Sequence, residues 1–122
     1  MANLKITEIK AFVPATDFER SRQFYQDLGF TMDWADGGLA YFHFEDASFL
    51  LQDFNDPHFA ANFMMHLVVE DVDAWWRKVQ ETGIAGRYGV RVSEIASQPW
   101  GMRDFVVYDP SGVLWRIGQD DE

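Results

Sequence analysis

The chain has 122 residues, a formal net charge of −10 and no cysteine. This length suffices for one domain with a sizeable core, and the lack of cysteine excludes disulfides, thiolate metal sites and cysteine nucleophiles. The acidic charge disfavours binding to the phosphate backbone of nucleic acids. Because no apolar run reaches the roughly 18 residues that span a membrane and the N-terminal residues lack a signal-peptide pattern, we expect a cytoplasmic protein.

The first half of the sequence predicts a helix between strands. A β-rich run at residues 5–14 precedes a stretch in which apolar side chains recur at helical spacing. Thr16 or Asp17 can cap this helix, because a short side-chain oxygen accepts hydrogen bonds from the free N–H groups of the first turn. Gly29 ends it, since glycine readily adopts the positive φ found after a helix. Further strands are expected at residues 30–34, 39–44 and 49–54.

The second half repeats this order. Asp71 and Gly83 bound a second amphipathic helix, and they lie twelve residues apart, as Asp17 and Gly29 do. A repeat of about half the chain length indicates a duplicated supersecondary unit. Strands are expected at residues 64–69, 90–95, 103–108 and 113–117.

Both halves therefore follow the order strand, helix and three strands. We predict a single α+β domain over residues 1–122, in which two tandem βαβββ modules, at about residues 4–54 and 63–119, are joined by a linker at residues 55–62. A helix would cover one face of each sheet, so the remaining faces would form a curved mixed sheet around a groove. Grooves of this kind bind small molecules.

Three segments resemble the motifs of a known family. Residues 17–30 match the pattern D-x(3)-S-x(2)-F-Y-x(2)-L-G-F, residues 70–73 match the start of a second-module helix, and residues 100–112 match W-G-x-R-x-F followed by D-P-x-G. With these motifs the chain resembles the vicinal oxygen chelate superfamily of glyoxalases, extradiol dioxygenases and antibiotic-resistance proteins, above all its bleomycin-resistance branch. The resemblance implies a homodimer in which two modules form each groove, within one chain or across two. The apolar segment 59–63 is a candidate contact between the chains.

The same resemblance argues against a metal centre. Metal-dependent members of the superfamily use four ligands of the His or Glu type, and the corresponding positions here are Lys10, residues 50–52, Met64 or His66, and Arg116. Lysine and arginine are cations that repel a metal ion, and a single histidine without an acidic partner does not chelate one. We therefore predict neither a metal nor another cofactor.

Catalytic motifs are equally sparse. No nucleophile elbow accompanies the serines, and the glycines are spread among turns and form no phosphate-binding loop. His43 and His66 are either structural residues of the sheets or polar contacts, including a general base, in the groove. We assign no catalytic residue.

Aromatic residues make up 16% of the chain and are the main candidates for ligand binding. Those on the predicted helices belong to the core, whereas Trp34 lies at a strand end and Trp100 lies in a glycine-containing loop. The resemblance implies that Trp34, His66 and Trp100 line the ligand crevice, where flat rings hold flat or cationic ligands. Arg116 is either a donor in the cavity or the partner of a carboxylate. The candidate ligand-binding residues are Trp34, Tyr41, His43, Met64, His66, Trp100 and Arg116.

These observations favour a metal-free binding protein, similar to bleomycin-resistance proteins, that sequesters an aromatic or cationic compound in a dimer groove. One alternative is an enzyme, either a glyoxalase-type lyase or isomerase or a dioxygenase-like protein, that uses a displaced metal site or only its histidines and carboxylates. A second alternative is a regulatory or scaffold module whose groove holds no ligand. The expected partners are a second copy of the chain and a small molecule, without nucleic acid or membrane.

Overall fold

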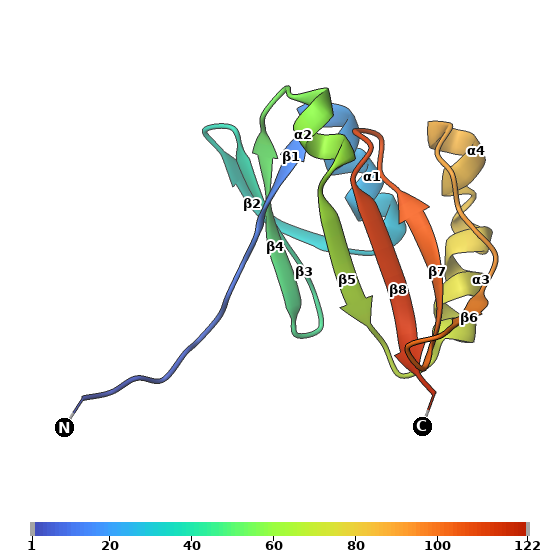
Figure 1. The fold of residues 1–122 in the computed structure, drawn as a ribbon. Coiled ribbons are helices and arrows are strands. Elements are labelled where there is room, and N and C mark those ends of the chain that lie inside the picture. The colour runs from blue at the N-terminus through green and yellow to red at the C-terminus, as the bar shows by residue number, and fades with distance from the viewer. Residues whose placement is uncertain (1, 122) are drawn as a thin grey trace.

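Two four-stranded sheets lie side by side in the computed structural model, which describes residues 2–121 (Figure 1). Sheet A has the strand order β1-β4-β3-β2 and contains β1 (Phe12–Ala15), β2 (Thr31–Asp36), β3 (Leu39–Phe44) and β4 (Ala47–Asp53). Sheet B has the order β5-β8-β7-β6 and contains β5 (Met64–Val68), β6 (Ala96–Gln98), β7 (Met102–Tyr108) and β8 (Leu114–Asp120). In each sheet the first strand pairs in parallel with the last, and the other pairs are antiparallel.

The helices are α1 (Phe18–Leu28), α2 (Pro57–Ala61), α3 (Val72–Thr82) and α4 (Ile84–Tyr88). The side chain of Asp17 accepts a hydrogen bond from the backbone N–H of Arg20 at the start of α1, and Asp71 caps α3 in the same way. Gly29 ends α1 with a φ of 123°, a conformation in which a Cβ would be strained. Within residues 2–121, no helix is long and apolar enough to cross a membrane.

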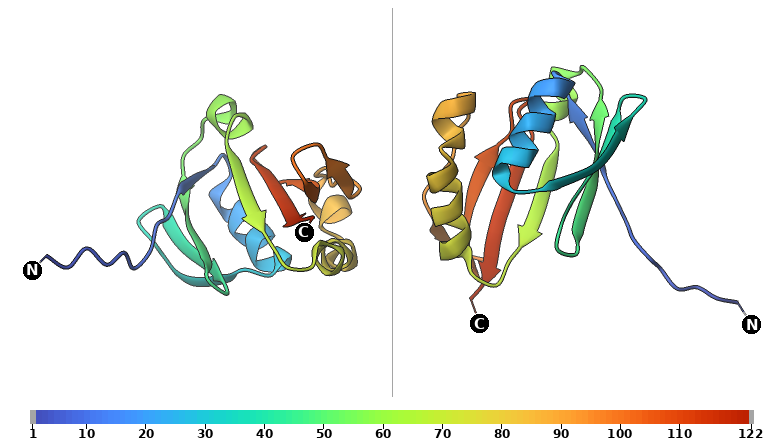
Figure 2. Two further views of the ribbon diagram at one scale, coloured as in Figure 1. Left: turned by 60° about the horizontal axis from the view of Figure 1, so that its bottom comes forward. Right: turned by 180° about the vertical axis from the view of Figure 1, so that it is seen from behind.

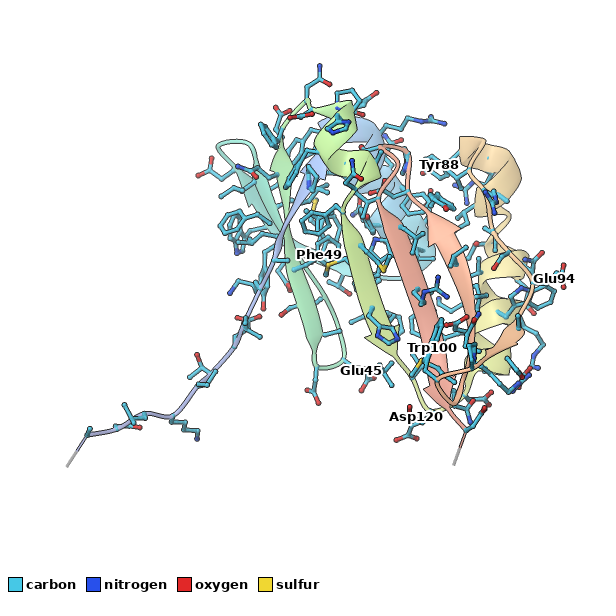
Figure 3. All side chains as sticks on the ribbon, viewed as in Figure 1. Glu45, Phe49, Tyr88, Glu94, Trp100 and Asp120 are labelled. Atoms are coloured by element: carbon cyan, nitrogen blue, oxygen red, sulfur yellow. The ribbon has the colours of Figure 1, made fainter. Side chains whose placement is uncertain are left out.

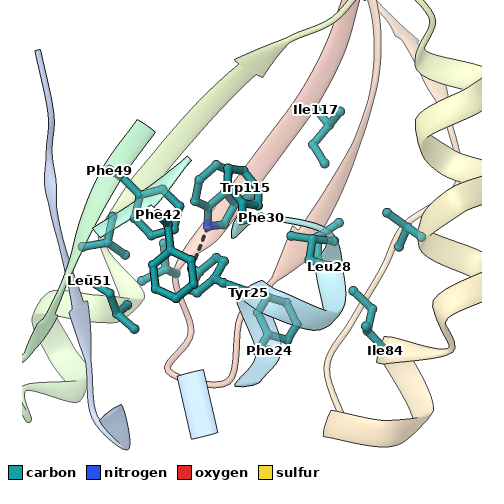
Figure 4. Packing of buried hydrophobic residues seen from close by; sticks show 14 of the residues in the cluster. Phe24, Tyr25, Leu28, Phe30, Phe42, Phe49, Leu51, Ile84, Trp115 and Ile117 are labelled. Atoms are coloured by element: carbon teal, nitrogen blue, oxygen red, sulfur yellow. Dashed lines mark hydrogen bonds between the residues drawn. The ribbon is translucent and has the colours of Figure 1, made fainter. Parts of the chain in front are cut away.

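One hydrophobic core joins the two sheets, and Tyr25 of α1 lies at its centre (Figure 4). Its ring lies 4.9 Å from that of Phe49 in sheet A and 5.7 Å from that of Trp115 in sheet B, measured between centroids. Phe24 and Phe42 pack beside it, and all of these rings are almost fully buried. Since Tyr25 of α1 packs against rings of both sheets, the two halves of the chain share one core.

The element order confirms the predicted α+β fold with two βαβββ repeats. The predicted strands at residues 30–34, 39–44, 49–54, 64–69, 103–108 and 113–117 correspond to β2, β3, β4, β5, β7 and β8. A short helix not anticipated from the sequence, α2, lies in the stretch expected to be a linker. It forms because Asp56 caps the N–H of Phe59 and Pro57 occupies the first turn, where proline is tolerated.

The strand predicted at residues 5–14 is wrong over most of its length. Only β1 pairs with a neighbour, and residues 2–11, which we call the N-terminal arm, form no helix or strand. The arm touches sheet A near Glu8, and its first residues run away from the body of the molecule (Figure 2). Leu4, Ile6 and Ile9 of the arm are 81–90% exposed. The arm therefore has the composition of a strand but no partner strand within residues 2–121.

The strand predicted at residues 90–95 is also wrong. Gly83 and Gly89 both adopt positive φ, and the residues between them form α4 instead of an extended connection. After α4 the backbone makes a single bridge, Val92 to Val107, and regular pairing begins only at β6. Ser93 holds this stretch in place, because its carbonyl accepts a hydrogen bond from the indole N–H of Trp76.

Candidate functional site

Each sheet has one face that packs into the core and one face that the helices leave open (Figure 3). Along β3, Ala40 and Phe42 are buried in the core, and Tyr41 and His43 therefore point to the opposite side. Trp34 of β2 is the register partner of Tyr41, and the centroids of their rings lie 6.2 Å apart. We call the side that carries these three residues the open face of sheet A.

A β-bulge shapes this face. The pairing between β2 and β3 shifts between Met32 and Trp34, so Asp33 is the extra residue in β2. The Asp33 carboxylate lies 2.6 Å from Nδ1 of His43, while Trp34 still lies beside Tyr41. The bulge thus places an acid and an indole, which are consecutive in sequence, on the same face.

The N-terminal arm adds a second carboxylate, that of Glu8, to the open face of sheet A. The Glu8 carboxylate accepts hydrogen bonds from the hydroxyls of Tyr41, at 2.6 Å, and of Ser48, and it pairs with Lys10 at 2.8 Å. These donors, the Lys10 ammonium foremost, lower the pKa of Glu8 to about 2. A cleft of about 470 Å³ lies here, and its lining residues are Thr7, Glu8, Asp33, Tyr41, His43, Glu45, Asp46 and Ser48.

The open face of sheet B is formed by alternate residues of β5 and β8. On β8, Trp115 and Ile117 are buried, and Arg116 between them points away from the core. His66 on β5 is the register partner of Arg116, and Met64 on the same side is 58% exposed. This face therefore combines a cationic side chain, an imidazole and a thioether.

A buried carboxylate holds Arg116. Asp104 of β7 is 2% exposed and accepts hydrogen bonds from Nη1 of Arg116, at 3.0 Å, and from Nε2 of Gln98, at 2.9 Å. Gly118, opposite Asp104 in the ladder, makes room for it, because a Cβ at this position would lie 3.0 Å from Cβ of Asp104 and 2.8 Å from Sδ of Met102. Of the two roles left open for Arg116, the structure shows the partner of a carboxylate.

Trp100 lies in the turn between β6 and β7 and is 60% exposed (Figure 3). The turn is tight, since the N–H of Gly101 donates to the carbonyl of Gln98 and Gly101 has a φ of 82°, which favours glycine. The guanidinium carbon of Arg116 lies 5.8 Å from the centroid of the Trp100 ring, within the range of a cation–π contact.

The seven candidate residues fall into two groups in a single chain. Trp34, Tyr41 and His43 lie on the open face of sheet A, and Met64, His66, Trp100 and Arg116 belong to the side of sheet B. A smaller cleft of about 300 Å³ links the two sheets, with Glu8, Ser48 and His66 among its lining residues. Neither Trp34 nor Trp100 lines either of these two clefts, and of the seven residues only Tyr41, His43 and His66 do.

A sequence model described as the Glyoxalase/Bleomycin resistance protein/Dioxygenase superfamily matches residues 6–117. The chain belongs to this superfamily. A bleomycin resistance protein of Klebsiella pneumoniae is 27% identical over 116 residues, which cover 89% of each protein. The predicted membership, with its likeness to the bleomycin-resistance branch, is confirmed.

Two solved structures support the same relationship. A bleomycin resistance determinant encoded on the transposon Tn5 has 25% identity and a TM-score of 0.81, over 96% of this chain and 100% of that one. A bleomycin-binding protein in complex with bleomycin has 25% identity and a TM-score of 0.82, over 94% of this chain and 99% of the other. The fold of this superfamily member is thus that of bleomycin-binding relatives.

The residues at the expected metal positions of the superfamily do not fit a metal ion. Lys10 pairs with Glu8 in the N-terminal arm, and Arg116 pairs with Asp104, so two of the positions hold cations that are already matched to carboxylates. Across residues 2–121, no group of three or more His, Asp or Glu side chains is arranged to hold a metal.

Sequence reasoning missed the acids that organise both faces. Glu8 lies in a segment expected to be a strand, and Asp33 reaches His43 only because of a bulge that leaves no mark in the sequence. Asp104 lies on the same side of β7 as Met102 and opposite Gly118 of β8. This arrangement indicates a buried carboxylate, but it can be recognised only once the register of the two strands is known.

Proposed function

We propose that this chain binds a flat, cationic aromatic compound and sequesters it without a metal and without catalysis. The observation that carries the proposal is the exposure of Trp34 and Trp100, which are 47% and 60% exposed on the two open faces. The aromatic side chains of the core, such as Phe24 and Tyr25, are fully buried. Exposed indole rings are suited to stacking against a flat ligand.

The charge of the chain favours a cation. The formal net charge is −10, and four carboxylates, of Glu8, Asp33, Glu45 and Asp46, line the larger cleft beside Tyr41. Such a surface attracts cations from solution and repels anions. Ligands of this kind include antibiotics of the bleomycin type, which the named relatives bind or resist.

We propose further that the groove forms between two copies of the chain. Trp34 and Trp100 lie on different sheets and line neither of the two clefts of a single copy. Pairing the open face of sheet A with that of sheet B of a partner would bring flat rings to both walls of one groove. The N-terminal arm supports an association, because its apolar side chains have no cover within the chain. Phe59 in the segment 59–63 is 42% exposed and is a further candidate contact. A cytoplasmic location stays a prediction from the sequence.

Titration of the purified protein with copper-free bleomycin tests this proposal. Binding should quench the tryptophan fluorescence in a saturable manner, and calorimetry should give one ligand per chain. The affinity should be the same after dialysis against a chelator. An unchanged emission and no heat of binding, with bleomycin and with a panel of flat cationic dyes, would overturn the sequestration of such compounds. With the dyes, which do not chelate metals, a signal that appears only after a divalent metal is added would refute the metal-free mode and favour an enzyme.

A further inference from the structure

Asp104 is placed so that it controls Trp100 by two routes. Through Gln98 it holds the strand β6, whose carbonyl group at Gln98 closes the turn that carries Trp100. Through Arg116 it fixes the guanidinium that lies over the indole ring. Both contacts end on one carboxylate whose exposed fraction is 2%. Such a carboxylate is held firmly, because loss of Arg116 would leave its charge unpaired in the protein and loss of Gln98 would leave it one hydrogen bond short.

The same carboxylate sets the charge of the wall on which a ligand would stack. Arg116 carries a positive charge under all ordinary conditions and lies 5.8 Å from the centroid of the Trp100 ring. An unpaired guanidinium at this distance would repel a cation that stacks on the indole and attract an anion. With Asp104 at 3.0 Å from Nη1, the pair is neutral as a whole.

We infer that Asp104 is a positioning residue that orients Trp100 through Arg116 and makes the open face of sheet B selective for cationic over anionic flat ligands. This inference rests on the proposed function, because it concerns the same site, and it adds which residue determines the charge of the ligand. The site thus distinguishes cationic from anionic ligands because Asp104 neutralises the charge of Arg116. It does not need a free carboxylate that points at the ligand.

The chain offers a matched control in Asp73 of α3. Asp73 also binds an arginine of β7, since Arg103 donates to both of its carboxylate oxygens, at 3.0 and 3.1 Å. Asp73→Asn and Asp104→Asn change the net charge of the chain by the same amount. Only Asp104 is connected to Trp100, so only its substitution should affect the ligand preference.

Three acridines that share one ring system measure this preference: 9-aminoacridine as the cation, acridine as the neutral compound and acridine-9-carboxylate as the anion. For the natural chain we expect affinity to fall in that order. In Asp104→Asn the ratio of cation to anion affinity should fall by roughly tenfold or more, as expected for one uncompensated charge near the ligand. In Asp73→Asn the ratio should stay within about twofold of the natural value, because long-range surface charge is screened by salt.

A readout without ligand tests the positioning by itself. In protein labelled with 5-fluorotryptophan, Trp100→Phe identifies the ¹⁹F resonance of Trp100. This resonance should shift or broaden in Asp104→Asn and in Arg116→Met, and it should stay in place in Asp73→Asn. Arg116→Lys keeps a cation beside Asp104 but loses the planar group, so it should move the resonance and retain the charge preference.

The outcomes separate the inference from the proposed function. If the acridines bind the natural chain but Asp104→Asn keeps its cation preference, the inference is wrong and sequestration stands. If no acridine binds, the proposed function fails for flat cations, and an unmoved Trp100 resonance in Asp104→Asn and Arg116→Met then rejects the positioning as well. Should Asp104→Asn fail to fold, Arg116→Met decides both points. Its Trp100 resonance should move, and its ratio of cation to anion affinity should rise because the Asp104 carboxylate is then unpaired; an unmoved resonance or an unchanged ratio would reject the inference.

Discussion

The hydroxyl of Tyr25 donates a hydrogen bond of 2.5 Å to the carboxylate of Asp109, and both residues are buried. Tyr25 belongs to α1 in the first half of the chain, and Asp109 begins the turn between β7 and β8 in the second half. The same hydroxyl accepts from the indole N–H of Trp115 at 2.8 Å. The bond is a polar connection between the two repeats inside an otherwise apolar core.

Removal of this hydroxyl should destabilise the fold. Tyr25→Phe leaves the carboxylate of Asp109 and the indole N–H of Trp115 without the hydroxyl as a partner, and each unsatisfied buried group costs about 1–3 kcal/mol. We expect the free energy of unfolding, measured by urea denaturation, to fall by at least about 2 kcal/mol. The control is Tyr41→Phe, because the hydroxyl of Tyr41 donates to Glu8 at the surface. This variant should lose less than about 1 kcal/mol of the free energy of unfolding. Equal losses in the two variants would refute this prediction.

Asp109 should make stability depend on pH. Burial raises its pKa from 3.8 to about 6, although hydrogen bonds from Tyr25 and from backbone N–H groups act in the opposite direction. The folded state therefore holds the proton in a range where the unfolded chain has released it. The stability that this group contributes is present at low pH and is lost as the pH rises through about 6.

Asp109→Asn removes this titration and so supplies the test. Between about pH 4.5 and about pH 7.5, the free energy of unfolding of the natural chain should fall relative to that of the variant by about 2 kcal/mol. Urea denaturation of both proteins at the two pH values measures the difference. A difference that does not change with pH would show that the pKa of Asp109 is not raised in the folded protein.

The absence of a side chain at Gly118 is a steric requirement of sheet B. Gly118→Ala would place a Cβ 2.8 Å from Sδ of Met102 and 3.0 Å from Cβ of Asp104, and overpacking of this kind costs about 1–3 kcal/mol. Gly86→Ala is the matched control, because Gly86 lies in α4 and an added Cβ there would point into open space. It should raise the free energy of unfolding by about 0.5–1 kcal/mol through the helix preference of alanine. Thermal denaturation of the two variants should show opposite shifts.

The indoles of the open faces should matter for the ligand and little for the fold. Trp34→Ala and Trp100→Ala should each weaken bleomycin binding by about 1–3 kcal/mol, as aromatic contact residues do, and change the free energy of unfolding by less than about 1 kcal/mol. Trp75, whose ring packs 4.9 Å from that of Phe44, serves as the reference, and Trp75→Ala should lower stability and spare binding. Calorimetric titration combined with urea denaturation separates the two effects, and full affinity in both Trp34→Ala and Trp100→Ala would contradict the proposed site.

The N-terminal arm should contribute to association and not to the fold of one chain. Serine is introduced at the apolar positions Leu4, Ile6 and Ile9. The control introduces serine at the polar positions Asn3, Lys5 and Thr7. Sedimentation velocity should show a weaker dimer for the apolar set and no change for the control, because exposed apolar area drives association. A natural chain that is monomeric at micromolar concentration would remove the basis of this prediction.

The sequence predicted the parts of the structure that depend on local signals. The caps at Asp17 and Asp71 and the glycines that follow α1 and α3 are local, and both helices lie where the pattern puts them. The alternation along β3 also sufficed to place Tyr41 and His43 on one face. A strand, however, needs a neighbour, and this explains the failures at residues 5–11 and 90–95, where the composition favours β structure and no regular partner is present.

The candidate site was predictable only in its residue types. The two tryptophans are exposed, but their separation on different sheets follows from the overall topology. The pairing of Arg116 with Asp104 could not be inferred, because it depends on which glycine faces which carboxylate across β7 and β8. The register between strands that are distant in sequence thus determines which side chains meet in the site, and this register cannot be predicted from a single sequence.

The shared aromatic cluster has a consequence for how the chain unfolds. Tyr25, Phe49 and Trp115 come from three elements in both repeats, and each ring is covered by the others. Neither repeat can melt alone without leaving large rings and a phenol–carboxylate bond in water. The two repeats are therefore separate in sequence and architecture but unfold as one unit. Calorimetry should record one endotherm for the entire polypeptide.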